Sequence, residues 1–193
     1  MTRKANNRGL EVEPSATAVL ILDMLSRFEF PDGAATARAA SKIAPRIAKL
    51  RQRARSAGIP VIYVNDNPGH WRSDSEALIR AGAADDSRGR AVIERLRPEQ
   101  GDYLVLKPRH SAFYATPLEV ILESIGARKL VLTGVSSHQC VLFTANDAHV
   151  RSFEIVVPSD CIGAPTAAQT KLAVSYFRKA LGAHVTTQAR WRP

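Results

Sequence analysis

The chain has 193 residues, of which 45% are hydrophobic and 23% are charged, and its formal net charge is +9 at pH 7. This length predicts about one domain, and the composition is that of a globular protein rather than a disordered or fibrous one. Two cysteines are too few for a disulfide framework or a four-thiolate zinc site, and no apolar run is long enough to span a membrane. We therefore expect a reducing, cytoplasmic setting with no membrane partner.

The start of the chain is polar and basic and lacks the apolar stretch of a secretory signal. We expect a flexible segment at residues 1–14, followed by a single domain at 15–193. The other basic residues are scattered, and no zinc-finger spacing, basic-zipper heptad or aromatic RNA-binding signature accompanies them. This pattern favours a solvated basic surface over a dedicated nucleic-acid site.

Short apolar runs rich in branched residues predict six β-strands, at 16–22, 60–64, 103–106, 130–134, 153–157 and 183–187. The first, second and fourth runs are apolar on both faces, as expected of parallel strands that helices cover on each side. Segments with helical periodicity lie between the runs. Strands that alternate with helices predict a three-layer α/β/α sandwich around a six-stranded, mostly parallel, Rossmann-like sheet.

The helical segments are expected at 41–57, 116–125, 137–151 and 165–181. Gly58 predicts the end of the first helix, whereas Pro45 fits that helix only in its first turn and leaves its start open. The residues 116–119 predict a capping box, with Pro117 at the first helical position. The segment 65–97, with its Pro, Gly and charged residues, predicts an irregular region with short helices beside the site.

Polar residues follow several of the expected strands, at the ends where ligands bind in this type of fold. Asp23 follows the first strand, Lys107 follows the third, and Cys140 lies in the turn and helix after the fourth. Each alone has an ordinary explanation, such as a helix cap, an exposed strand end or a small buried hydrophobe. Together they supply a carboxylate base, an ammonium and a thiol nucleophile. The first turn of a helix and a nearby ammonium lower the pKa of a thiol, so we expect Cys140 to ionise readily.

Three motifs, in order along the chain, resemble those of the isochorismatase-like cysteine hydrolases. They are the first-strand motif Val19–Leu25, the lysine motif Lys107–Phe113 and the nucleophile turn Gly134–Val141. The likeness extends from about residue 16 to residue 187. Members of this family hydrolyse small C–N bonds in amides, carbamoyl compounds and nicotinamide, or the vinyl ether of isochorismate. The resemblance therefore implies a small-molecule substrate and a homodimer or homotetramer.

The same resemblance implies roles for individual residues. It implies a catalytic triad of Asp23, Lys107 and Cys140 that works without a cofactor. It also implies a cis peptide bond between Val135 and Ser136. In the family, that bend aims the amides of Ser136 and Cys140 at the carbonyl oxygen of the substrate, which gives an oxyanion hole.

One subfamily pattern is missing from this chain. Nicotinamidases of the family hold a metal through an Asp-x-His pair after the second strand. Here the residue two positions after Asp66 is Pro68, which cannot be a ligand, and the spacing from Asp66 to His70 does not fit the pattern. We therefore expect no metal, and a nicotinamidase loses support.

Three aromatic side chains are candidates for the walls of the substrate pocket, although each could equally be ordinary core: Phe28, Trp71 and Tyr114. We expect His138 to line the same pocket or to cap the helix rather than to act as a base. His138 stands where the serine-elbow pattern G-x-S-x-G has its second glycine, which disfavours a serine nucleophile. Cys161 follows the fifth expected strand, and we expect it to be a buried, inert thiol.

The sequence thus predicts a cofactor-independent cysteine hydrolase that cleaves a small amide-type C–N bond through a thioester. Isochorismatase and nicotinamidase are the alternatives within the enzyme class. A non-catalytic binding protein on a hydrolase scaffold is the alternative of another class, because fold does not dictate function.

Overall fold

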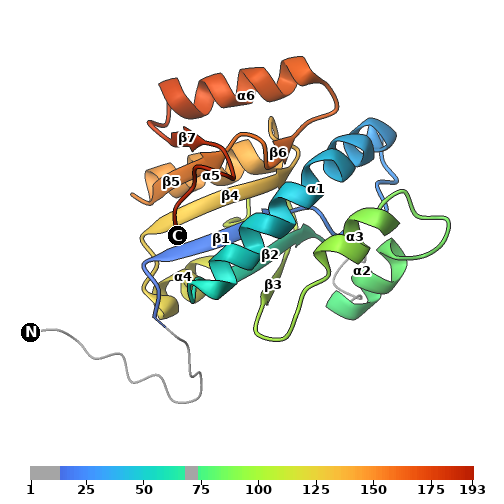
Figure 1. Cartoon of the computed structure of the whole chain (residues 1–193), viewed down its shortest axis with the longest axis horizontal. Helices are drawn as coiled ribbons and strands as arrows, with labels where there is room; N and C mark the ends of the chain where they lie inside the picture. Colours follow the sequence, from blue (N-terminus) through green and yellow to red (C-terminus); the bar gives the residue numbers. More distant parts are fainter. Residues whose placement is uncertain (1–13, 68–73) are drawn as a thin grey trace, which may run out of the picture.

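The computed structural model describes residues 14–67 and 74–193 (Figure 1). The predicted segment 1–14, apart from its last residue, and the pocket candidate Trp71 lie outside the described residues. In chain order the elements are β1 Thr17–Leu22, α1 Gly33–Ser56, β2 Val61–Asp66, α2 Ser75–Gly82, α3 Arg90–Leu96, β3 Tyr103–Lys107, α4 Leu118–Ile125, β4 Lys129–Val135, α5 Cys140–Val150, β5 Glu154–Pro158, β6 Ile162–Gly163, α6 Ala167–Lys179 and β7 His184–Thr186.

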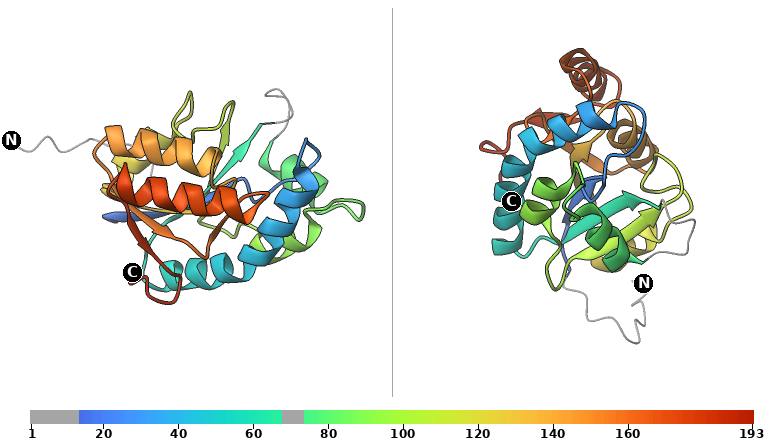
Figure 2. Two further views of the ribbon diagram at one scale, coloured as in Figure 1. Left: turned by 90° about the horizontal axis from the view of Figure 1, so that it is seen from above. Right: turned by 90° about the vertical axis from the view of Figure 1, so that its right-hand side faces the viewer.

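The strands form one parallel sheet in the order β3-β2-β1-β4-β5-β7. Helices cover both faces of this sheet, as the three views show (Figure 2). The predicted three-layer α/β fold is therefore confirmed. The structure adds β6, a strand of two residues that pairs with β4 and is too short to show as an apolar run.

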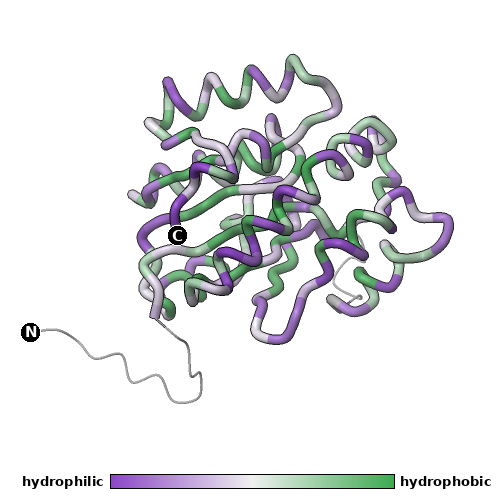
Figure 3. The backbone as a smooth tube through the Cα atoms, in the orientation of Figure 1, coloured by the Kyte–Doolittle hydropathy of each residue, from purple (hydrophilic) through white to green (hydrophobic). Residues whose placement is uncertain are grey.

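The central strand β1 explains why the sheet needs helices on both sides. Its residues Ala18, Leu20 and Leu22 pack into one core with side chains of α4, α5 and α6. Val19 and Ile21 point the other way, into a second core with α1 and α3. Successive side chains of a strand alternate between faces, so an apolar residue at every position needs cover on both. The hydropathy colouring shows this apolar centre between more polar helix surfaces (Figure 3).

Helix α1 begins earlier than predicted. It starts at Gly33, so Pro45 lies inside the helix and not in its first turn. Pro45 is exposed, and the amide hydrogen that it lacks would have bonded the carbonyl of residue 41, which is exposed too. Water can therefore replace the lost bond. The predicted end is confirmed, because Gly58 follows the helix with a left-handed φ of 69°.

The capping box predicted at the start of α4 is wrong. Pro117 is the N-cap residue rather than the first helical residue, and the N-cap makes no side-chain capping bond. The Thr116 hydroxyl instead donates to the carbonyl of Ala112 at 2.5 Å and accepts from the amide of Leu118 at 3.2 Å. The loop before α4 thus uses Thr116 to close its own turn.

The region between β2 and β3 contains two short helices, α2 and α3, as the sequence predicts for its described part. Residues Val92, Ile93 and Leu96 of α3 pack into the core beneath α1. None of the helices in the described part of the chain is both long and apolar enough to cross a membrane.

Candidate active site

Four chemically reactive side chains meet at the carboxyl edge of the sheet. Asp23 directly follows β1, Asp66 ends β2, Lys107 ends β3, and Cys140 begins α5 after β4. The sheet order β3-β2-β1-β4 makes these strands neighbours, and the register pairs Asp66 with Lys107. The structure therefore brings together the three predicted triad residues and adds Asp66.

Lys107 lies at the centre of this group with no exposed surface. Its Nζ is 3.0 Å from Oδ2 of Asp23 and donates to Sγ of Cys140 at 3.6 Å. The same ammonium contacts Oδ1 of Asp66 in a short ion pair. A buried charge is stable only where opposite charges and hydrogen bonds compensate it. The two carboxylates supply that compensation.

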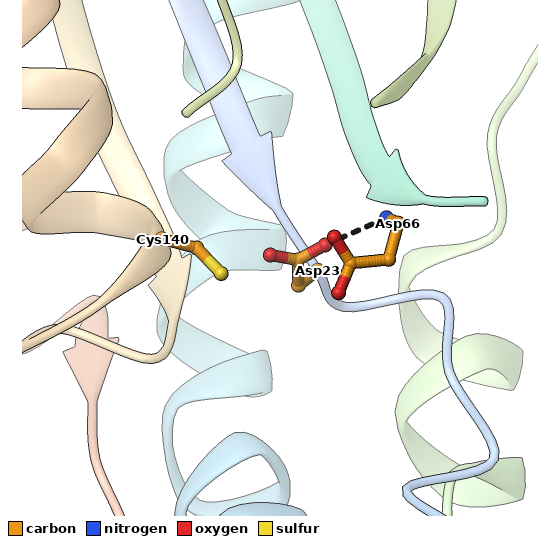
Figure 4. Close-up of side chains that lie close together, drawn as sticks. All are labelled: Asp23, Asp66 and Cys140. Carbon is orange, nitrogen blue, oxygen red and sulfur yellow. Dashed lines mark hydrogen bonds between the residues drawn. The ribbon is translucent and has the colours of Figure 1, made fainter. Parts of the chain in front are cut away.

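The carboxylate of Asp23 is held in place by the next strand. The backbone N–H of Asp66 donates to Oδ1 of Asp23 at 2.9 Å, and the amide of Asp23 donates to the carbonyl of Val64 at 2.8 Å. Figure 4 shows the Asp66 contact and the sulfur of Cys140 pointing toward the Asp23 carboxylate. Asp23 is therefore oriented to exchange a proton with the thiol.

The protonation of the site differs from the predicted readily ionised thiol. Burial raises the pKa of the Cys140 thiol, the Asp23 carboxylate raises it further, and the Lys107 ammonium opposes both. Burial also raises the pKa of Asp23, against the charge of Lys107. Burial lowers the pKa of Lys107, but Asp23, Cys140 and Asp66 outweigh this and raise it above its usual value. The raised pKa of Cys140 favours the neutral thiol over the thiolate, and the adjacent Asp23 carboxylate is a group that can accept its proton.

The turn before Cys140 has a distinctive backbone. The peptide bond between Val135 and Ser136 is cis, at the position that the family resemblance implies. The amide of Ser137 donates to the carbonyl of Gly163 at 2.7 Å, which anchors the turn to β6. Cys140 is the first residue of α5, so its amide belongs to the first turn, whose N–H groups have no carbonyl partner within the helix.

His110 is a further neighbour of the Cys140 sulfur that the sequence did not reveal. Its Nδ1 lies 3.8 Å from Sγ of Cys140, and its ring packs at a tilt of 38° against Phe143 of α5, with centroids 5.4 Å apart. Among the histidines, the sequence pattern pointed to His138 as a site residue and gave His110 no role of its own. Its position, three residues after Lys107 in the same motif, was the feature of the sequence that could have indicated a place in the site.

The predicted pocket walls occupy different environments. Phe28 is buried in the core beneath α1, next to Phe30, which favours a packing role. The side chain of Tyr114 is exposed, and His138 is half-buried. Burial lowers the pKa of His138, although Asp32 at the start of α1 opposes this. Their contacts with a substrate stay predictions.

The arrangement of charges in the site argues against a metal ion. Asp23, Asp66 and Cys140 offer ligand atoms that lie within 4.8 Å of one another. However, the Lys107 ammonium contacts all three side chains and already supplies the positive charge that a cation would bring. A divalent ion placed here would have to displace or repel that ammonium. The donor set therefore suits an internal lysine better than a metal.

Comparison with known proteins identifies the family. The Isochorismatase domain model matches residues 17–190. This chain belongs to the isochorismatase family. The predicted family resemblance is thus confirmed over nearly the whole chain.

Three relatives show how close this isochorismatase family member is to known proteins. The isochorismatase family protein YaaI of Bacillus subtilis is 37% identical over 171 residues, which cover 89% of this chain and 93% of YaaI. The crystal structure of N-carbamoylsarcosine amidase from Thermoplasma acidophilum is 31% identical with a TM-score of 0.71, covering 93% of this chain and all of that one. Ureidoacrylate amidohydrolase RutB of Methylobacterium radiotolerans is 27% identical, covering 78% of this chain and 68% of RutB. These matches support a hydrolase, as predicted.

Proposed function

We propose that this protein is a cysteine hydrolase that cleaves a small amide-type C–N bond through a thioester intermediate. The single observation that carries this proposal is the Lys107 ammonium, which contacts both the Asp23 carboxylate and the Cys140 sulfur while having no exposure of its own. Base, nucleophile and a fixed positive charge are thereby in contact before any substrate binds. Such preorganisation is what lowers the barrier to nucleophilic attack.

In the first half of the reaction, Asp23 removes the proton of the Cys140 thiol, and the thiolate attacks the carbonyl carbon of the substrate. The amides of Ser136 and Cys140 hold the developing oxyanion. Lys107 stabilises the negative charge that moves between Asp23 and the sulfur. When the C–N bond breaks, the leaving amine takes the proton from Asp23, and the acyl group stays on Cys140 as a thioester.

Two considerations support a substrate class: the activities that the names of two relatives describe, and the bonds that a thiolate and an adjacent carboxylate can cleave. The names of two relatives describe an amidase and an amidohydrolase, that is, enzymes that hydrolyse amide bonds. Attack by a thiolate needs a carbonyl carbon, and a leaving nitrogen can accept the proton that Asp23 takes from the thiol; carbamoyl compounds and simple amides offer both. We therefore propose a small amide or carbamoyl compound as the substrate.

The test is ammonia release from a panel of primary amides and N-carbamoyl amino acids. Replacing Cys140→Ala should abolish release, whereas Cys161→Ala, the matched change at the other cysteine, should leave it intact. Ammonia release that survives in Cys140→Ala would disprove the mechanism. Pyruvate release from isochorismate, with no ammonia from any amide, would favour the isochorismatase alternative. Absence of any turnover would favour a binding protein.

A further inference from the structure

The polar neighbours of the Cys140 sulfur differ sharply in their access to solvent. Lys107 has no exposed surface, and the side chain of Asp23 is only 12% exposed. His110 is exposed, yet its Nδ1 lies 3.8 Å from the same sulfur. The nucleophile thus has a buried carboxylate for one proton transfer and a solvent-facing imidazole for another.

The second half of a thioester mechanism needs a base that incoming water can reach. Asp23 is poorly placed for this, because its side chain is only 12% exposed, with Oδ1 accepting from the Asp66 amide and Oδ2 lying 3.0 Å from Nζ of the buried Lys107. His110, by contrast, is exposed, and its Nδ1 lies 3.8 Å from the sulfur. We propose that His110 is a second catalytic residue, the general base that activates water for hydrolysis of the thioester. This proposal rests on the cysteine mechanism above. Asp23 is the base for formation of the thioester, and His110 is the base for its hydrolysis.

The proton balance closes with His110 in this role. The neutral imidazole, with its proton on Nε2, accepts a proton from water at Nδ1 while the water oxygen bonds to the thioester carbonyl carbon. The C–S bond then breaks, and the carboxylic acid product leaves. The Cys140 thiolate recovers its proton from Nδ1 across the 3.8 Å contact that the structure shows. The resting thiol and the neutral imidazole are both restored.

His110 is fixed to the helix that carries the nucleophile. Its ring packs at a tilt against Phe143, one turn into α5. The next residue, Ser111, donates its hydroxyl to Asp147 in a short hydrogen bond. The amide of Ala112 donates to the hydroxyl of Thr144 at 3.0 Å. Because α5 begins at Cys140, these contacts attach the loop of His110 to the helix that carries the sulfur.

The experiment separates the two halves of the reaction with p-nitrophenyl acetate, whose leaving group needs no proton. The wild-type chain should release a burst of one nitrophenolate per Cys140, followed by steady release as the acetyl thioester hydrolyses. His110→Gln should keep the burst but slow the steady phase by roughly 100-fold or more, the usual contribution of a general base. Mass spectrometry should then find the acetyl group on Cys140, and hydroxylamine, which needs no base, should restore release.

His149→Gln, the matched change of an exposed histidine on α5, should leave both phases unchanged. A steady phase that stays at the wild-type rate in His110→Gln would overturn the proposal. So would an equal loss of burst and steady rates that hydroxylamine does not rescue, because that pattern marks a structural role. Nitrophenolate release that survives in Cys140→Ala would instead refute the cysteine mechanism itself and the role of His110 with it.

Discussion

Lys107 sets the charge balance of the site at the scale of single residues. Its ammonium is buried between Asp23, Asp66 and the sulfur of Cys140, so every change to one of these groups alters the others. Lys107 and Asp66 shift the pKa of the Cys140 thiol in opposite directions. Lys107 lowers it, whereas Asp66 raises it.

Replacing Lys107→Met should therefore raise the pKa of Cys140 further and slow its alkylation by iodoacetamide at neutral pH. The variant should also lose about 3–5 kcal/mol of unfolding free energy, as expected when one partner of a buried ion pair is removed. Urea denaturation and the alkylation rate measure the two effects. An alkylation rate equal to that of the wild type would show that the ammonium does not act on the sulfur.

Replacing Asp66→Asn should have the opposite effect on the thiol. The backbone N–H that orients Asp23 is retained, while the negative charge that raises the pKa of Cys140 is removed. Alkylation of Cys140 at a fixed pH should become faster than in the wild type. The comparison should be made with Cys161→Ala in every variant, and slower alkylation in Asp66→Asn would contradict the charge assignment.

At the scale of elements, the backbone at the end of β4 lies so close to β1 that it leaves no room for a side chain. Gly134 has a φ of 109°, and a Cβ at this position would lie 2.1 Å from the carbonyl oxygen of Leu22 in β1. Both the backbone conformation and the close approach therefore require glycine. The residue precedes the turn that leads to Cys140, so a shift here moves the nucleophile.

Gly134→Ala should cost several times the roughly 1 kcal/mol of Gly58→Ala, the matched control, because a Cβ at Gly58 meets nothing within 4 Å. Gly58 also has a positive φ, of 69°, so the comparison isolates the steric clash from the conformational cost. Urea unfolding of both variants measures the difference. Equal losses of stability would mean that β1 can move away from Gly134.

Helix α1 and strand β2 are joined by a buried polar contact. Nη1 of Arg51 donates to the Tyr63 hydroxyl at 2.6 Å and to the carbonyl of Arg97 at 2.9 Å. Burial raises the pKa of Tyr63 to about 12, although the hydrogen bond from Arg51 opposes this. A tyrosine in the unfolded chain ionises near 10.

Stability should consequently fall as the pH rises from about 10 to about 12, because the unfolded chain then loses a proton that the folded chain keeps. The contribution of Tyr63 to this loss is on the order of 2–3 kcal/mol. Tyr63→Phe should be less stable than the wild type below pH 10, and the gap should close as the pH rises. Urea unfolding across this range is the measurement, with Tyr114→Phe as an exposed control. A difference in unfolding free energy between the wild type and Tyr63→Phe that does not change with pH would contradict the raised pKa of Tyr63.

The sequence predicted the strands and the residues at their ends, because each follows from one simple rule. It did not predict the features of the site that depend on tertiary packing. The strands were predictable because Leu20, Ile21 and their neighbours are apolar on both faces. Asp23 and Lys107 stood out because parallel strands place their carboxyl ends together. His110 lies in a loop whose path depends on contacts with α5, which no periodicity reveals. The raised pKa of Cys140 likewise follows from its depth in the fold rather than from its position in the helix.

Considered as a whole molecule, the chain keeps its two thiols in different environments. Cys140 is 7% exposed beside His110, whereas Cys161 is fully buried in the core beneath α1. Burial also raises the pKa of Cys161. The folded protein therefore presents one thiol to reagents in solution, and the second thiol appears only on unfolding.

Alkylation of the native protein by iodoacetamide should label Cys140 alone, and alkylation in concentrated urea should label Cys161 as well. The rate of the second label under native conditions should follow global unfolding, because Cys161 has no exposed surface. Peptide mapping by mass spectrometry measures both rates. Labelling of Cys161 faster than unfolding would reveal a local opening near β5, and Cys140→Ala isolates that signal.

The order of the site residues along the chain has a consequence for biosynthesis. Asp23, Asp66 and Lys107 precede Cys140, and each is contributed by a different strand or by the residue directly after it. A growing polypeptide therefore carries Asp23, Asp66 and Lys107 before Cys140 has been made. The thiol acquires these partners only when β1 to β4 have paired, so a chain that has not yet paired these strands carries an ordinary cysteine. The contacts around the thiol are thereby reserved for molecules in which these four strands have come together.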